Sequence, residues 1–243
     1  MKKFIIFMGI ALFFVSNVYA ARPLPADDAG VVDVGAFEME YGYEYVDAAD
    51  KEYNHSVVLK TGLLKNLDVG IEVPYQFIDL EDSEDVDGFS DVVIMSKWNI
   101  LAERERLPDF AVSFSYKTES GNDEKSLGTG RPEYTFTGIF SKQFDKATYY
   151  VNLGCSVKKE FEDTFNYNFA VEYFLNEKVN LVGEIFGDTI FSGKFDDNAT
   201  SGLVGFNYAI NDTITYDLGL TLGISEAEPD YKIATGFTFA FGG

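Results

Sequence analysis

The sequence contains very little cysteine and histidine, since Cys155 and His55 are the only residues of their kinds among 243. A single thiol cannot form an internal disulfide, so the fold must hold without covalent cross-links. After residue 20 the chain also lacks any run of about 18 apolar residues, which excludes a transmembrane helix there. Aromatic residues, by contrast, are abundant, with 23 Phe and 15 Tyr against 1 Trp.

Positive charge is scarce as well. The chain has 19 Lys and Arg against 40 Asp and Glu, and its net charge is -21 at pH 7. Such a chain repels the phosphates of nucleic acid, so we predict no nucleic-acid partner. Many carboxylates fall in the turn-rich stretches 79–88 and 225–230. We interpret most of them as solvated loop charges and predict no metal site, because these loops lack a fixed ligand spacing.

The N-terminus has the pattern of an export signal. Lys2 and Lys3 precede an apolar run over residues 4–15, and Val18 and Ala20 place small residues before a cleavage point. The apolar run is too short for a membrane anchor. We therefore predict that residues 1–20 are a cleaved signal peptide and that the protein is exported.

Strict alternation of side chains characterises the rest of the chain. From Phe37 to Tyr45 every second residue is large and apolar or aromatic, whereas Glu38, Glu40 and Glu44 occupy positions between them. A period of two predicts a β-strand. About twelve such segments follow one another, and most have the roughly 9–11 residues that a tilted strand needs to cross a bilayer. An even number of strands suits a closed up-and-down barrel.

The connections between these segments favour the same fold. Short polar turns alternate with longer loops that are acidic and rich in Gly and Ser, an asymmetry typical of outer-membrane barrels with both termini on the periplasmic side. The short turns are "LKN", "DKA", "NEK" and "IND", and the long loops are "DAADKE", "LEDSEDVDG", "ESGNDEKSLGTGR" and "FSGKFDDNAT". The segment "LAERERLPD" departs from this pattern, because it is long and charged where a short turn is expected.

We therefore predict an all-β protein in which residues 35–243 form a closed antiparallel transmembrane up-and-down β-barrel of about twelve strands. Residues 21–34 would be an N-terminal periplasmic or plug segment. The expected location is the bacterial outer membrane, with lipid and lipopolysaccharide outside the barrel and the barrel-assembly machinery as a partner. The alternative is a secreted β-sandwich acting as a binding module, whose two sheets would bury their apolar faces against each other. The weakly polar, glycine-rich opposite face favours the barrel, because small residues suit a narrow, curved interior.

Two sets of residues follow from the barrel hypothesis. Charged residues in the inward phase would line the lumen and govern binding or selectivity: Glu38, Glu40, Glu44, Lys60, Glu72, Asp91, Lys97, Lys117, Glu172 and Asp217. Aromatic residues near strand ends would form girdles at the membrane interfaces. These are Tyr75, Phe77, Trp98, Tyr116, Phe144, Tyr149 and Tyr231.

Catalytic and cofactor-binding motifs do not emerge from the sequence. His55 is followed directly by Ser56, and adjacent residues of a strand point to opposite faces, so the two cannot form a dyad. The glycine-rich stretch "SLGTGR" lacks the Lys and the strand-to-helix context of a phosphate-binding loop. We predict a protein without enzymatic activity and without a cofactor.

Several stretches also resemble a known family. "ARPLPADDAGVVDVGAFEMEYGYEY", "GLLKNLDVGIEVPY", "GFSDVVIMSKWNIL", "SLGTGRPEY" and "PDYKIATGFTFAF" are similar to the outer-membrane family named for the MetA pathway of phenol degradation. The chain departs from that pattern at Ala26 and Glu133, and its terminal aromatic, Phe241, lies two residues from the end. The resemblance implies a transporter-like or channel-like barrel associated with uptake of small, often aromatic compounds.

The sequence thus predicts an outer-membrane channel or transporter for passive uptake of small molecules. If its inward charges line an open pore, their negative excess would favour cations. Two other functions stay open. The lumenal charges could pair with one another and close the barrel, which would make it a structural or adhesive protein, or the chain could be a β-sandwich binding module.

Overall fold

The computed structural model describes residues 22–80, 84–159, 162–191 and 199–242. The predicted signal peptide, residues 1–20, lies outside the described residues. Within them, no helix is long and apolar enough to span a bilayer.

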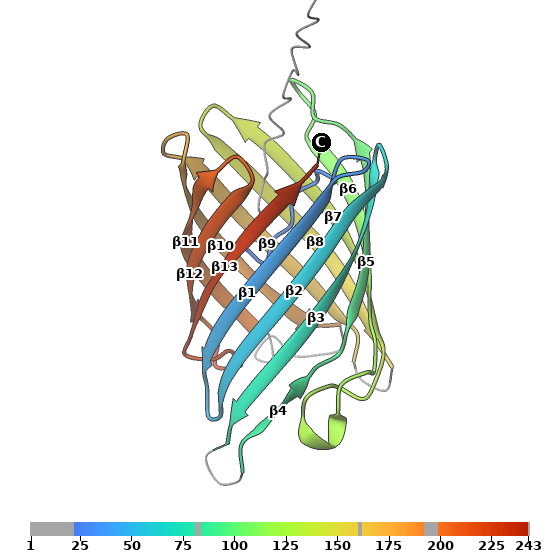
Figure 1. Ribbon diagram of the computed structural model, residues 1–243, viewed down its shortest axis with the longest axis vertical. Coiled ribbons are helices and arrows are strands. Elements are labelled where there is room, and N and C mark those ends of the chain that lie inside the picture. The colour runs from blue at the N-terminus through green and yellow to red at the C-terminus, as the bar shows by residue number, and fades with distance from the viewer. Residues whose placement is uncertain (1–21, 81–83, 160–161, 192–198, 243) are drawn as a thin grey trace, which may run out of the picture.

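The alternating segments form one closed antiparallel barrel with steeply tilted strands (Figure 1). The strands pair with their neighbours in chain order, apart from β4 and β5, which both pair with β3. β1 closes the barrel by pairing with both β2 and β13. The strands are β1 Phe37–Asp47, β2 Lys51–Leu64, β3 Leu67–Asp79, β4 Val86–Phe89, β5 Val93–Leu101, β6 Asp109–Lys117, β7 Glu133–Phe144, β8 Ala147–Lys158, β9 Thr164–Phe174, β10 Val179–Ile190, β11 Ala199–Asn211, β12 Ile214–Gly223 and β13 Tyr231–Phe241.

The wall is twelve strands wide although the described residues contain thirteen strand segments, because β4 and β5 share one position beside β3. β4 pairs with residues 75–78 of β3, and β5 pairs with residues 67–72. Between the two segments, the Ser90 amide still donates to the Pro74 carbonyl at 3.0 Å. The prediction of about twelve strands in a closed up-and-down barrel is confirmed, and the sandwich alternative is wrong.

The two ends of the barrel differ as the connections predict. One end, the short-turn rim, carries the tight turns 65–66, 145–146 and 212–213 together with the C-terminal end of β13. The other end, the long-loop rim, carries residues 118–132 with the short helix η1 (Asp123–Lys125). The prediction of a long loop at "DAADKE" is wrong. β1 and β2 continue into this stretch and leave only residues 48–50 between them.

The outer wall carries the large apolar side chains. Four residues from different strands have at least half of their surface exposed there: Phe37, Trp98, Phe136 and Val204. A water-soluble protein rarely exposes so continuous an apolar surface, and lipid is the environment that satisfies it. Among the described residues, closure pairs both edges of every strand except β4, which pairs only with β3 at the long-loop rim.

The seven predicted girdle residues all belong to the outward-facing phase of their strands and divide between the two ends. Tyr75, Phe77, Tyr116 and Tyr231 lie toward the long-loop rim, and Trp98, Phe144 and Tyr149 lie toward the short-turn rim. The rings of Phe144 and Tyr149 are in contact across the turn between β7 and β8, with centroids 6.0 Å apart. Their role as interfacial anchors stays a prediction.

Candidate functional site: the occupied lumen

The inside of the barrel is occupied by the chain's own N-terminal residues. Residues 22–34, called the inner segment here, enter from the short-turn rim and lie within the wall (Figure 1). The segment joins the wall through a parallel bridge between Val34 and Gly62. Gly62 has no side chain, and a Cβ there would collide with the carbonyls of Val32 and Asp33.

From this bridge the inner segment follows the wall in the order of the strands. Its backbone amides donate to side chains of the wall at each step: Val32 to Asp68 on β3 at 3.1 Å, Ala29 to Ser141 on β7 at 2.9 Å, Asp27 to Asn152 on β8 at 2.7 Å and Ala26 to Glu184 on β10 at 3.2 Å. A segment without regular secondary structure needs such partners for its backbone groups. It therefore circles the inner wall as a partial ring.

The far end of the ring is held by Arg22. Its Nε lies 3.4 Å from Oδ2 of Asp217 on β12, and its Nη2 donates to the carbonyl of Thr235 on β13 at 3.2 Å. Asp217 is 1% exposed, so Arg22 supplies the cation that a buried carboxylate requires. Arg22 thus ties the start of the segment to the strands that close the barrel.

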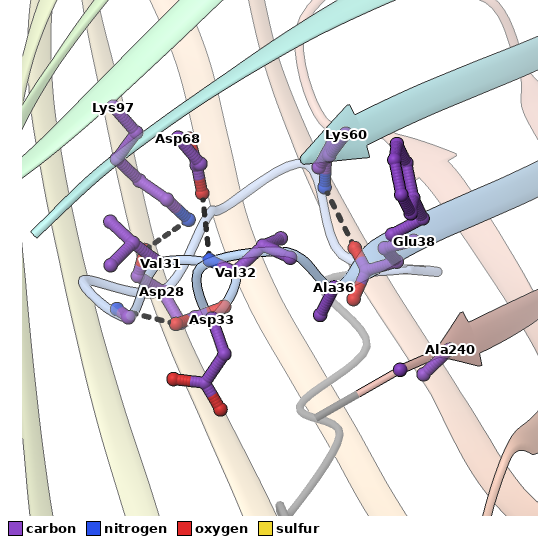
Figure 2. Close-up of a pocket in the computed structure, with 13 residues that line it drawn as sticks. Asp28, Val31, Val32, Asp33, Ala36, Glu38, Lys60, Asp68, Lys97 and Ala240 are labelled. Carbon is purple, nitrogen blue, oxygen red and sulfur yellow. Dashed lines mark hydrogen bonds and ion pairs between the residues drawn. The ribbon is translucent and has the colours of Figure 1, made fainter. Parts of the chain in front are cut away.

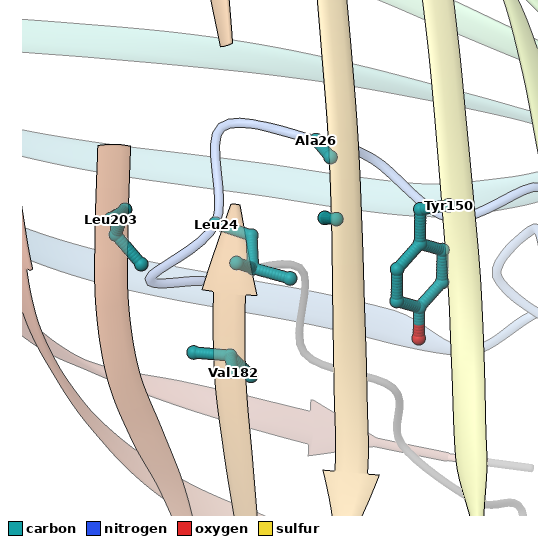
Figure 3. Close-up of a cluster of buried hydrophobic side chains, with 6 residues drawn as sticks. Leu24, Ala26, Tyr150, Val182 and Leu203 are labelled. Atoms are coloured by element: carbon teal, nitrogen blue, oxygen red, sulfur yellow. The ribbon is translucent and has the colours of Figure 1, made fainter. Parts of the chain in front are cut away.

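An apolar patch holds the middle of the segment. Leu24 and Ala26 pack against Tyr150, Val182 and Leu203 of the inner wall, together with Ala170 (Figure 3). Leu24 is 8% exposed and Val182 5%. Burying a leucine side chain contributes about 1.5–3 kcal/mol, so this contact adds appreciably to the polar contacts.

Lys97 holds the remaining part of the ring. Nζ of Lys97 on β5 lies 2.9 Å from Oδ1 of Asp27 and also 2.9 Å from the carbonyl of Asp28. Although burial opposes ionisation, the attraction of Lys97 and Lys60 lowers the pKa of Asp27 below its usual value. Burial raises the pKa of the neighbouring Asp28 to about 6. The two adjacent carboxyls therefore titrate in different pH ranges.

A cavity of about 140 Å³ remains between the inner segment and the short-turn rim (Figure 2). Lys60 and Lys97 line it together with carboxylates of Asp28, Asp68 and Glu38. Nζ of Lys60 lies 2.5 Å from Glu40 and 3.3 Å from Glu38, and Lys60 is the cross-strand partner of Glu38. The cavity is large enough for several water molecules and is lined by polar partners for them.

The structure brings most of the predicted lumenal residues into pairs. Glu38, Glu40 and Lys60 form one cluster, while Lys97 and Asp217 pair with the inner segment. Lys117 lies 2.9 Å from Glu133 at the long-loop rim. Glu172 accepts hydrogen bonds from the Tyr150 hydroxyl at 2.7 Å and from Asn180 at 2.8 Å.

The other predicted lumenal residues lie in different settings. Glu44 and Glu72 belong to the inward phase, and neither forms an ion pair with a described residue. The sequence predicts Asp91 on the inward face of a strand. In the structure it lies between strands, in the interruption that separates β4 from β5. Its carboxylate accepts from the amides of Gly121 and Thr129 and so fastens the loop 118–132.

Sequence reasoning missed the partners that the inner segment contributes. Arg22, Asp27 and Asp28 precede the first strand, where no periodicity assigns them a face. Asp68 and Glu184 occupy inward positions, so the alternation of β3 and β10 could have found them. Among the described residues, no group of three or more His, Cys, Asp and Glu is arranged to hold a metal ion.

The fold is that of outer-membrane channels and porins. An outer membrane channel from Pseudomonas putida F1 superposes with a TM-score of 0.71 at 14% identity, covering 88% of this chain and 98% of that one. The KdgM porin in complex with disordered oligogalacturonate has a TM-score of 0.62 at 8% identity over 84% of this chain and 99% of its own. The CymD monoaromatic hydrocarbon channel has a TM-score of 0.51 at 8% identity over 86% and 89%.

The family follows from the sequence itself. The family described as "Putative MetA-pathway of phenol degradation" matches residues 20–241, and the chain belongs to it. No curated protein matches the chain in sequence.

Proposed function

We propose that the protein is an outer-membrane channel for passive uptake of small molecules, and that its inner segment sets the width of the passage. The observation that carries the proposal is the ring of contacts between residues 22–34 and the inner wall. An apolar outer wall places the barrel in lipid, and a polar, charged interior offers a route for a hydrated solute. The predicted periplasmic side is the short-turn rim.

The charge of the lumen supports a preference for cations. Glu172 and Glu184 are buried carboxylates of the wall that form no ion pair with a described residue, whereas Asp217 is neutralised by Arg22, and Lys60 and Lys97 are already engaged by Glu40 and Asp27. Carboxylate rings favour cations and disfavour anions in pores. We further propose that the solutes taken up are small aromatic or other apolar compounds. CymD, a monoaromatic hydrocarbon channel, and a porin solved with oligogalacturonate both share the fold, so the fold alone selects neither solute.

The experiment is conductance of the refolded chain, without residues 1–20, in a planar bilayer, compared with a variant that also lacks residues 21–33. The barrel strands lie outside this deletion, so the variant should keep heat-modifiable migration on a gel. We expect discrete steps from the longer chain and larger steps from the variant, because the deletion removes the ring from the lumen. Equal conductance of the two would show that the inner segment does not define the passage.

A closed structural barrel is the competing function, and the same pair of proteins distinguishes it. If the longer chain is silent while the variant conducts, the inner segment closes the barrel under those conditions. If both are silent although both are folded, the channel proposal fails and the structural function takes its place.

A further inference from the structure

The connection between β5 and β6 is unlike the other connections at the short-turn rim. The turns 65–66, 145–146 and 212–213 have two residues each, whereas residues 102–108 form a hairpin that extends beyond the rim (Figure 1). Inside it, the amides of Arg104 and Leu107 donate to each other's carbonyls at 3.0 and 3.1 Å. Residues 102–108, called the rim hairpin here, explain why "LAERERLPD" is longer than a short turn.

The rim hairpin lies against the outward side of β7, which continues beyond its last pair with β6. Lys142 on β7 points outward, because its neighbour Ser141 faces the inner segment. Nζ of Lys142 lies 2.9 Å from Oε1 of Glu103 and donates to the carbonyl of Arg104 at 2.6 Å. It also donates to the carbonyl of Leu107 at 3.4 Å. One lysine thus holds the hairpin against the outer wall.

This contact lies at the level of the predicted aromatic girdle. Nζ of Lys142 is 5.7 Å from the ring centroid of Phe144, and Lys142 is the cross-strand partner of Tyr149. Interfacial aromatic residues lie at the level of the lipid headgroups. Leu107 is 45% exposed and continues the apolar wall onto the hairpin. The rim hairpin would therefore lie beside the headgroups of the adjacent leaflet.

The exposed charges around the rim hairpin have a positive excess. Arg104 and Arg106 are exposed, as is Lys146 in the neighbouring turn, and none of the three forms an ion pair with a described residue. Glu105 and Asp145 are exposed carboxylates beside them. Three cations against two carboxylates leave a net positive charge, in a chain whose net charge is -21.

The negative charge of the whole chain does not cancel this excess. Its acidic connections follow β3 and β12 and belong to the long-loop rim. Even with tilted strands, the two rims are more than about 20 Å apart. Charges in salt solution are screened over about 10 Å at 0.1 M ionic strength. An anionic group at the short-turn rim therefore responds mainly to the charges of that rim.

We propose that the rim hairpin binds the headgroup of an anionic phospholipid in the adjacent leaflet, which is predicted to be the periplasmic one. Arg104 and Arg106 would bind the phosphate, because guanidinium groups match phosphate oxygens in a bidentate geometry. The acyl chains would lie on the apolar outer wall next to Leu107. A zwitterionic headgroup carries an ammonium that the positive excess repels, so it fits less well. The inference goes beyond the proposed function, because it requires a barrel in lipid but no conduction.

The test is native mass spectrometry of the folded protein in a nonionic detergent, with equimolar dioleoyl phosphatidylglycerol and dioleoyl phosphatidylethanolamine. The two lipids have the same acyl chains and differ in headgroup charge. We expect the protein to retain phosphatidylglycerol at least about fivefold more than phosphatidylethanolamine, because one basic residue near an anionic lipid contributes about that factor. Equal retention of the two lipids would overturn the inference.

Variants locate the site. Arg104→Gln combined with Arg106→Gln should abolish the preference, and Glu105→Gln should increase it by removing an opposing carboxylate. Lys65→Gln combined with Lys178→Gln is the matched control, because it removes two exposed cations from other connections at the same rim. The control should keep the preference. An equal loss in the control, or a preference that survives in the arginine variant, would overturn the inference.

All of these side chains are exposed, so each variant should keep heat-modifiable migration on a gel. Lipid retention and conduction are measured separately, and the two proposals therefore fail separately. A silent bilayer together with preferential retention of phosphatidylglycerol would contradict the channel and keep the lipid site. Conductance without that preference would overturn the lipid site and keep the channel.

Discussion

The guanidinium of Arg22 occupies the space in which a side chain at Gly42 would lie, since an added Cβ there would collide with Nη1. Gly236 on the adjacent β13 also faces Arg22, because a Cβ added there would lie 2.8 Å from Nε of Arg22. Pro23 in turn lies against Gly219, at 2.9 Å from the equivalent position. The small residues of the inner wall therefore form the groove that receives the start of the inner segment.

Gly42→Val should displace Arg22 and loosen the inner segment. We expect larger or more frequent conductance steps than in the unmodified protein, because the cation that neutralises Asp217 leaves its place. Gly183→Ala is the control, since a Cβ at Gly183 meets no atom closer than 3.8 Å. If Gly42→Val and Gly183→Ala both conduct like the unmodified protein, the prediction is wrong. The inner segment would then be held by contacts other than those of Arg22.

Acidification should stabilise the seated inner segment. Asp28 has a pKa of about 6 in place against 3.8 when released, so the seated form binds a proton more readily. A raised acid pKa favours the seated form as pH falls, and this advantage is lost as pH rises through about 6. Asp27 acts in the opposite sense, but its lowered pKa confines that effect to pH below 3.8.

Between pH 7 and pH 5 the shift of Asp28 should favour the seated form about tenfold. The measurement is open probability in a planar bilayer at the two pH values, with Asp28→Asn as the comparison. Open probability should fall at pH 5 in the unmodified protein and change much less in the variant. A rise at pH 5 that Asp28→Asn abolishes would contradict the assigned direction.

Ion selectivity should depend on the carboxylates that lack a paired cation. Glu72 faces inward without an ion pair to a described residue, whereas Glu40 lies 2.5 Å from Lys60. Glu72→Gln should move the reversal potential in a salt gradient toward zero by reducing cation preference. Lys60→Gln should move it the other way, because Glu38 and Glu40 lose their counter-charge. Unchanged potentials in both would remove these residues from the conduction path.

Trp98 offers a direct test of the outer wall. It is the only tryptophan in the chain, it is 54% exposed and it lies toward the short-turn rim. We expect its fluorescence to be quenched by lipids brominated in their acyl chains and to be little affected by a water-soluble quencher. Efficient quenching from water instead would place the short-turn end of β5 outside the membrane.

Alternation was sufficient to predict the barrel, because a two-residue period assigns each side chain of a strand to one wall. It placed Glu38 and Phe37 on opposite faces without knowledge of any partner. It could not show that Lys60 lies opposite Glu38, since pairing requires the register of β1 against β2. Register also explains why "DAADKE" is not a long loop. β1 and β2 stay paired up to Asp47 and Lys51, and this cross-strand pairing overrides the local turn propensity.

The alternation of side chains could not predict where the inner segment lies, because the segment is not a strand. Arg22, Asp27 and Asp28 have no regular secondary structure, and their positions depend on glycines and carboxylates far along the chain, such as Gly236 and Asp217. Asp91 is a related case. It continues the alternation of a strand, yet the interruption at residues 90–92 turns it toward the loop 118–132, where amide donors are available.

Single-channel recording of the folded chain, with and without residues 21–33, tests the central claim most directly. The ring of contacts from Arg22 to Val34 predicts discrete, cation-favouring steps that become larger when the inner segment is removed. Two folded proteins that are both silent, or that conduct identically, would contradict it.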